Sequence, residues 1–139
     1  MITKNKGEWS ELYVFLKLLG DGILYAGDKN LNKIENSYYP VIEIIRNEKN
    51  KIKHYRTDNQ KIKITDQDNN LLLILPMAEF EEKAKLLLNA IKNSNGTFSV
   101  SQIENFMHKI NCLKVKADSL DKSDLTVVLH DCKTYTNET

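Results

Sequence analysis

The spacing of apolar side chains predicts an amphipathic helix near the start of the chain. Within residues 8–19, apolar side chains recur at positions 12, 15, 16 and 19, which is the i, i+3, i+4, i+7 spacing of one helix face. Gly20 and Gly22 follow, and glycine favours the left-handed backbone with which helices commonly end. One face of this helix is therefore expected to lie in a hydrophobic core.

Two further helices are predicted in the second half of the chain. Pro76 suits the entry to a helix over residues 77–92. The apolar face of that helix consists of Phe80, Ala84, Leu87, Leu88 and Ile91. A shorter helix follows, with Ser99 or Ser101 as its N-cap. Its apolar face consists of Ile103, Phe106, Met107 and Ile110.

Alternating and β-branched segments predict several strands. Residues 23–26 and 41–46 are short apolar strands, and Pro40 directly precedes the second. Residues 51–64 alternate between apolar and charged side chains around a turn at 57–60, which predicts a hairpin with a basic face. Two more strands are predicted at residues 71–75 and 113–115.

The β-branched segment at residues 124–131 is the strongest strand signal in the chain. A strand this apolar requires neighbouring strands on both edges. The following residues, 132–139, are mostly polar, and they suffice for a turn but not for a return strand with its covering helix. The predicted fold class is α/β, a mixed β-sheet flanked by helices. We expect residues 1–139 to form a single domain that is truncated after the strand beginning at Asp124.

Composition excludes several classes of protein. Lysine and arginine number 20 against 19 acidic residues, so any contact with nucleic acid must come from local clusters rather than from a basic arm. No secretory signal is visible at the start, and the longest apolar run, residues 71–75, is too short to span a bilayer. Cys112 and Cys132 form no CxxC pair. We therefore expect a cytoplasmic protein with reduced thiols and no membrane partner.

Three acidic residues are candidates for a metal site. Glu8 and Glu11 are spaced i, i+3 in line with Leu12, at the edge of the face expected in the core, where an unpaired carboxylate is costly. Asp124 begins an apolar strand, a position at which nucleases hold Mg²⁺. Structural roles account for the same residues, because first-turn acids complement the helix dipole and aspartate is a common turn residue.

Five basic residues gather in the predicted hairpin, where they are candidates for contact with phosphates. They are Lys51, Lys53, Arg56, Lys61 and Lys63. Charged side chains along an edge strand also prevent aggregation, so this cluster has a structural explanation as well. The histidines lack metal-ligand spacing, and the sequence contains neither a phosphate-binding glycine loop nor a GxSxG motif.

Four segments, in order along the chain, resemble the HpaII family of type II restriction endonucleases. They are residues 5–19 (NKGEWSELYVFLKLL), 28–32 (DKNLN), 37–46 (SYYPVIEIIR) and 122–131 (KSDLTVVLHD). The likeness runs from about residue 5 to about residue 135, so it covers nearly all of this chain. It covers less than half of a typical member of the family.

The resemblance implies a restriction-endonuclease-like fold of the PD-(D/E)xK type and Mg²⁺-dependent cleavage of double-stranded DNA at a short palindrome, CCGG in the family's namesake. Carried over by position, Asp124 is a catalytic, metal-binding acid, and Glu8 and Glu11 are first-helix acids that support the metal centre. The family's next strand, with its catalytic lysine, has no counterpart in this sequence, and Lys133 lies in the turn. We therefore expect an amino-terminal fragment, inactive alone, whose partners are DNA and either a carboxy-terminal half or a second copy.

Two other functions are compatible with the same residues. The chain would be a non-catalytic DNA-binding module if the hairpin of residues 51–63 contacts DNA, and its affinity would then depend on salt. It would be a helix-and-sheet domain without a metal if the three acids only cap secondary structure. In that case Mg²⁺ would leave the melting temperature unchanged.

Overall fold

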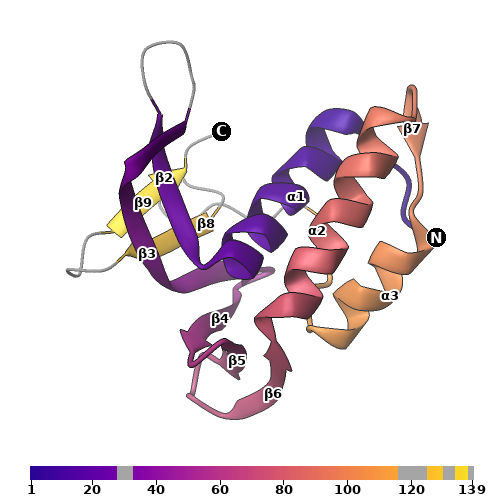
Figure 1. Cartoon of the computed structure of the whole chain (residues 1–139). Helices are drawn as coiled ribbons and strands as arrows, with labels where there is room; N and C mark the ends of the chain where they lie inside the picture. The colour runs from indigo at the N-terminus through magenta and orange to yellow at the C-terminus, as the bar shows by residue number, and fades with distance from the viewer. Residues whose placement is uncertain (28–32, 116–124, 130–133, 138–139) are drawn as a thin grey trace.

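The computed structural model of the chain describes residues 1–27, 33–115, 125–129 and 134–137. Within these ranges, three helices pack against an antiparallel sheet (Figure 1). The helices are α1 (Lys6–Asp21), α2 (Met77–Lys92) and α3 (Ser101–Lys109). All three predicted helices are thus confirmed, and the combination of helices with a sheet agrees with the predicted class.

The described strands form one larger sheet and one short pair. The larger sheet has the order β6-β5-β4-β3-β8-β9, and β2 also pairs with β3. Its strands are β2 (Ile23–Gly27), β3 (Lys33–Glu48), β4 (Lys51–Asp58), β5 (Lys61–Asp66), β6 (Leu71–Pro76), β8 (Leu125–Leu129) and β9 (Thr134–Asn137). The short pair is β1 (Lys4–Asn5) with β7 (Thr97–Phe98).

Strand β3 connects the two parts of the larger sheet. Its first part pairs with β2, where Ile23 lies opposite Pro40. Its second part lies between β4 and β8, so that Ile44 is opposite Tyr55 on one side and Val127 on the other. The predicted strand at residues 41–46 is therefore the second part of a longer strand, and the two parts of this strand pair with different neighbours.

Four features of the sheet and of α3 differ from the sequence-based predictions. Every pairing among the described strands is antiparallel, so no parallel pair of a mixed sheet occurs in this part of the chain. A return strand, β9, pairs with β8 although its sequence is polar, because strand pairing uses backbone groups that any side chain permits. Residues 113–115 form no strand. The N-cap of α3 is Val100, and no side chain caps that helix end.

Both ends of α1 have the local chemistry that fixes a helix. At its start, the Asn5 side chain accepts a hydrogen bond from the backbone N–H of Glu8 at 2.8 Å, and the Glu8 carboxylate accepts one from the Asn5 N–H at 3.2 Å. This is a reciprocal capping box. At its end, Gly22 adopts a left-handed backbone with φ 67°, as the prediction required.

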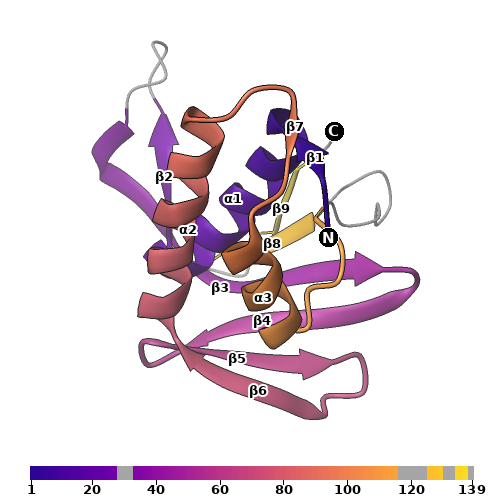
Figure 2. The ribbon, with the colours of Figure 1, turned by 90° about the vertical axis from the view of Figure 1, so that its right-hand side faces the viewer.

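The core lies between the helices and the sheet. Figure 2 shows the three helices on the same side of strands β3 to β6. The predicted stripe of α1 is fully buried, and Phe15 from this stripe packs edge-on against Tyr55 of β4, with 4.9 Å between ring centres. Phe80 of α2 packs in the same way against Phe106 of α3. Each such buried side chain contributes about 1.5–3 kcal/mol of hydrophobic free energy.

The apolar strand β6 lies at an edge of the larger sheet. Leu71, Leu72 and Ile74 are 55%, 40% and 44% exposed, whereas Leu75 is buried. Only one face of this strand therefore contributes to the core. Among the described residues, no helix is long and apolar enough to cross a lipid bilayer.

Candidate functional site

Glu8, the first of the candidate metal ligands, lies half-buried at the start of α1. One of its carboxylate oxygens accepts the Asn5 N–H of the capping box, and the other lies 3.8 Å from the Lys4 ammonium. These contacts are the helix-capping role that the sequence left as an alternative. They hold the Glu8 carboxylate at the helix end rather than toward the core.

Glu11 and Asp124 complete the predicted acidic set. Glu11 is half-buried on α1 and interacts with another group of the chain. Asp124 lies outside the described residues, as does Cys132, whereas the adjoining Leu125 pairs with Arg46 of β3. Across the described ranges, no group of three or more histidine, cysteine or acidic residues could hold a metal ion. The convergence of Glu8, Glu11 and Asp124 therefore stays a prediction.

The five basic residues of the hairpin do not share one face. Side chains alternate along a strand, and the buried Tyr55 and Ile64, which lie opposite each other, mark the face covered by helices. Lys51 and Lys53 are on that same face by their spacing from Tyr55. The other three, Arg56, Lys61 and Lys63, are on the opposite face. The predicted single basic face is therefore corrected, while DNA contact by each residue stays a prediction.

On the opposite face, two of these cations already pair with acidic side chains. Arg56 lies 3.7 Å from the carboxylate of Glu43, which also contacts His54 Nδ1 at 2.6 Å. Lys63 lies 3.6 Å from Asp58. This face of the hairpin therefore presents charges of both signs.

The structure contains a buried ionic cluster that the sequence analysis did not identify. Arg46 and Glu48 of β3 point to the helix side of the sheet, and both side chains are almost completely buried. Lys53 of β4 contacts Glu48 at 3.1 Å. The available signal was the spacing of Arg46 and Glu48, which places two charges on the same face as the buried Ile44.

Backbone groups of the segment after α3 satisfy the remaining bonding capacity of this ionic cluster. The Glu48 carboxylate accepts hydrogen bonds from the N–H groups of Leu113 and Lys114 at 3.0–3.1 Å. Arg46 donates to the Lys114 carbonyl at 2.7 Å, and Lys53 donates to the Asn111 carbonyl. The cluster therefore fixes residues 111–114 on the sheet, although they form no regular structure.

The surroundings of Glu48 favour its charged form. Burial alone would raise the pKa of this carboxyl group, but the Leu113 N–H, the Arg46 guanidinium, the Lys114 N–H and the Lys53 ammonium outweigh burial and lower the pKa. The Arg46 guanidinium also lies 4.6 Å from the centre of the Phe15 ring, a cation–π contact with α1. Glu48 therefore remains ionised in the folded protein.

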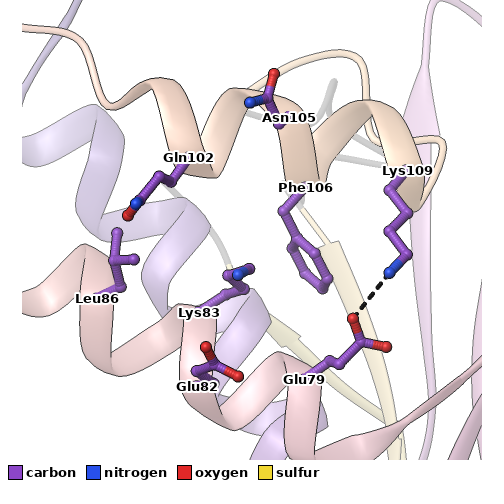
Figure 3. Close-up of a pocket in the computed structure, with 8 residues that line it drawn as sticks. All are labelled: Glu79, Glu82, Lys83, Leu86, Gln102, Asn105, Phe106 and Lys109. Atoms are coloured by element: carbon purple, nitrogen blue, oxygen red, sulfur yellow. Dashed lines mark hydrogen bonds and ion pairs between the residues drawn. The ribbon is translucent and has the colours of Figure 1, made fainter.

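The surface formed by the described residues includes a pocket between two helices and another beside the ionic cluster. One, of about 340 Å³, lies between α2 and α3, and a 2.9 Å ion pair between Lys109 and Glu79 links the two helices beside it (Figure 3). The other, of about 290 Å³, lies at the turn end of the β3–β4 hairpin beside the ionic cluster. Its lining residues are Glu48, Lys49, Lys51, Lys53, Leu113 and Lys114.

Comparisons with known proteins complete the description of the site. Residues 5–139 match the family model described as HpaII restriction endonuclease. The chain is 42% identical over 132 residues to the type II restriction enzyme HpaII of Haemophilus parainfluenzae, an alignment that covers 94% of this chain and 37% of that enzyme. The chain thus spans little more than a third of that relative's length. No solved structure matches the chain significantly.

Proposed function

Because the chain belongs to the HpaII restriction endonuclease family, we propose that it is the amino-terminal part of a restriction-endonuclease-like domain of the PD-(D/E)xK type. Its substrate is double-stranded DNA with a short palindrome, and CCGG, the site of the family's namesake, is the first sequence to test. The observation that carries this proposal is the family match from residue 5 to residue 139. The 42% identity over almost the whole chain agrees with it.

The metal that we propose for this site is Mg²⁺. The candidate ligands, Asp124, Glu11 and Glu8, are all carboxylates, and Mg²⁺ prefers such oxygen ligands. The described residues fit a metal site only in part, because Glu8 caps α1. Asp124 is thus the principal ligand of the proposal. Glu11, which is not part of the capping box, is the second ligand.

A measurement of cation binding tests this ligand assignment without any catalysis. We expect Mg²⁺ to raise the melting temperature of the chain, since an ion that binds only the folded state stabilises that state. Asp124→Asn should abolish that increase, whereas Glu8→Gln should retain it, because a glutamine oxygen still accepts the Asn5 N–H of the capping box. An unchanged Mg²⁺ response in Asp124→Asn would exclude Asp124 as a ligand.

We propose further that residues 1–139 by themselves do not cleave DNA. The resemblance places a catalytic lysine on a strand after Asp124, and an acid alone leaves the attacking water without its activating group. Incubation of the purified chain with Mg²⁺ and plasmid DNA should therefore leave the plasmid supercoiled. Cleavage that Asp124→Ala abolishes would contradict this expectation and would indicate that copies of the chain assemble a complete site.

A chimera tests the endonuclease assignment itself. Residues 5–139 would replace the aligned segment of the Haemophilus parainfluenzae enzyme, and cleavage of a plasmid that contains CCGG sites would be followed. We expect the chimera to cleave, and Asp124→Ala in the chimera to slow cleavage more than about 100-fold, because even indirect metal-site changes cost up to that factor. Asp68→Ala, an exposed turn residue, is the matched control. A folded chimera that leaves the plasmid uncut would count against the assignment.

The alternative function, a non-catalytic DNA-binding module, is favoured by one observation. Lysines line most of the pocket at the turn end of the β3–β4 hairpin. Under this alternative, neutralising the hairpin lysines would remove salt-sensitive DNA affinity. Asp124→Ala would leave cleavage by the chimera unchanged.

A further inference from the structure

The pocket at the turn end of the β3–β4 hairpin is lined by cations from separate segments of the chain. Lys49 comes from the turn, Lys51 and Lys53 come from β4, and Lys114 comes from the segment after α3. Glu48 is the acidic residue of the lining. The pocket is therefore formed by tertiary structure, since residues more than 60 positions apart meet there.

Glu48 does not neutralise this pocket. Its oxygens already contact Lys53 at 3.1 Å, Arg46 at 3.5 Å and the two backbone N–H groups described above. Arg46 and Lys53 together carry more positive charge than Glu48 carries negative charge. Lys49, Lys51 and Lys114 add three further lysines, so that four of the six lining residues are lysines.

The turn that presents Lys49 is not favourable for lysine. Lys49 and Asn50 have φ values of 53° and 65°, as in a two-residue turn with a left-handed backbone at both central positions. Asparagine and glycine are the usual residues in such turns, and other L-residues adopt this backbone at a cost. Formation of the turn therefore does not account for lysine at position 49.

We propose that this pocket binds a phosphate group of the DNA backbone. Ammonium groups donate charge-assisted hydrogen bonds to phosphate oxygens. A volume of about 290 Å³ lies at the low end for small-molecule sites and is ample for a phosphate group. Such a contact positions the duplex without reading its sequence. The inference rests on the proposed function in one respect, that DNA is the substrate.

The ionic cluster beneath the pocket would keep these lysines in place. Lys53 is held by Glu48 and by the Asn111 carbonyl, and the backbone of Lys114 is held by both Glu48 and Arg46. Ligand-binding side chains act best when neighbouring bonds fix their positions before the ligand arrives. The opposite face of the hairpin, where Arg56 and Lys63 pair with acids, lacks this arrangement.

A comparison of three charge-matched double variants of the full chain tests the pocket. Lys49→Asn with Lys51→Gln removes two pocket cations, and asparagine suits the backbone of the turn. Lys61→Gln with Lys63→Gln removes two cations from the opposite face of the hairpin. Lys85→Gln with Lys92→Gln removes two exposed cations from α2 and is the control. Binding to a short duplex is measured between about 50 and 200 mM salt.

We expect the pocket variant to bind more weakly by roughly 10- to 60-fold at about 0.1 M salt, with a salt dependence shallower by about 1.8 in the slope of log affinity against log salt. The loss should be the same for a duplex with CCGG and for one without it. The α2 variant should bind as the unchanged chain does. If the double variant of the pocket fails to fold, Lys51→Gln alone, at an exposed position, is measured instead. It should lower the affinity, and it should reduce the slope by half as much as the double variant.

Three outcomes would overturn the proposal. The first is unchanged duplex affinity in the folded pocket variant, or a loss confined to the Lys61–Lys63 variant, which would place DNA on the opposite face. The second is the absence of duplex binding by the unchanged chain even at the lowest salt. The third is micromolar binding of inorganic phosphate, lost in the pocket variant, without duplex binding, which would assign the pocket to a free anion. None of these outcomes decides the endonuclease assignment, because cleavage by the chimera tests that separately.

Discussion

The ammonium group of Lys53 lies 3.1 Å from the carboxylate of Glu48, on neighbouring strands, with only 11% and 4% of the two side chains exposed. Charges so deeply buried lose their hydration, and they are tolerated only where partners replace the water. Here the partners come from β3, from β4 and from the segment at residues 111–114. The pair therefore joins the sheet to the chain that follows α3.

Removal of Glu48 is expected to destabilise the protein strongly. Glu48→Ala leaves Arg46 and Lys53 buried without their common partner, which typically costs about 3–5 kcal/mol in the free energy of unfolding. Glu79→Ala is the matched control, since its 2.9 Å pair with Lys109 is largely exposed and contributes less than about 1 kcal/mol. Urea unfolding of the variants measures both effects. Similar losses in the two variants would contradict the importance of the buried cluster.

The same carboxylate predicts how stability changes with pH. The pKa of Glu48 in the folded protein is lower than its ordinary value of 4.5, so the unfolded chain binds the proton more readily. The stabilisation by Glu48 is therefore complete above pH 4.5 and is lost as the pH falls below 4.5 and through the lower folded pKa. Melting temperatures across this acidic range should fall steeply for the unchanged chain. They should fall less for Glu48→Gln, which has no carboxyl group to protonate.

Gly20 is expected to be indispensable for the contact between α1 and α2. A Cβ at position 20 would lie 2.6 Å from the backbone nitrogen of Glu81, closer than such atoms can approach. Gly20→Ala should therefore lower stability, by about 1–3 kcal/mol for overpacking, although alanine is the better helix former. In the same helix, a Cβ at Gly7 would lie 3.4 Å from Asn5 Oδ1, an ordinary van der Waals distance, so Gly7→Ala should leave stability unchanged or slightly higher. Equal effects in the two variants would show that α1 and α2 adjust to the added methyl group.

Cys112 is expected to be unreactive in the folded protein. Burial in the core raises the pKa of its thiol to about 11, so that almost no thiolate, the reactive form, exists near neutral pH. In a Cys132→Ser background, a thiol reagent should modify Cys112 only as fast as the chain opens. Addition of urea should accelerate the reaction to the rate of a free thiol. Rapid modification without urea would show that the segment after α3 opens readily.

The sequence by itself determined the helices and most of the residues that face the core within them, although Leu88 of the predicted α2 face is not part of the core. Apolar spacing identified the buried stripe of α1, and Gly22 identified its end, because both signals arise from neighbouring residues of one element. The alternation of residues 51–64 identified the hairpin of β4 and β5 for the same reason. The family resemblance also rested on sequence alone, and the match over residues 5–139 confirmed it.

Only the tertiary structure decided which polar residues lie together. In the sequence, Glu8 and Glu11 were equal candidates for a metal ligand, but in the structure the Glu8 carboxylate forms a capping box with Asn5. Strand register separated Lys51 from Lys63 onto opposite faces of the hairpin, and the fold brought Lys114 to Glu48 across 66 positions. Local spacing specifies the face of an element on which a side chain lies. The partner that covers this face, and hence the ionic cluster and the pocket, depends on contacts between segments that are distant in the sequence.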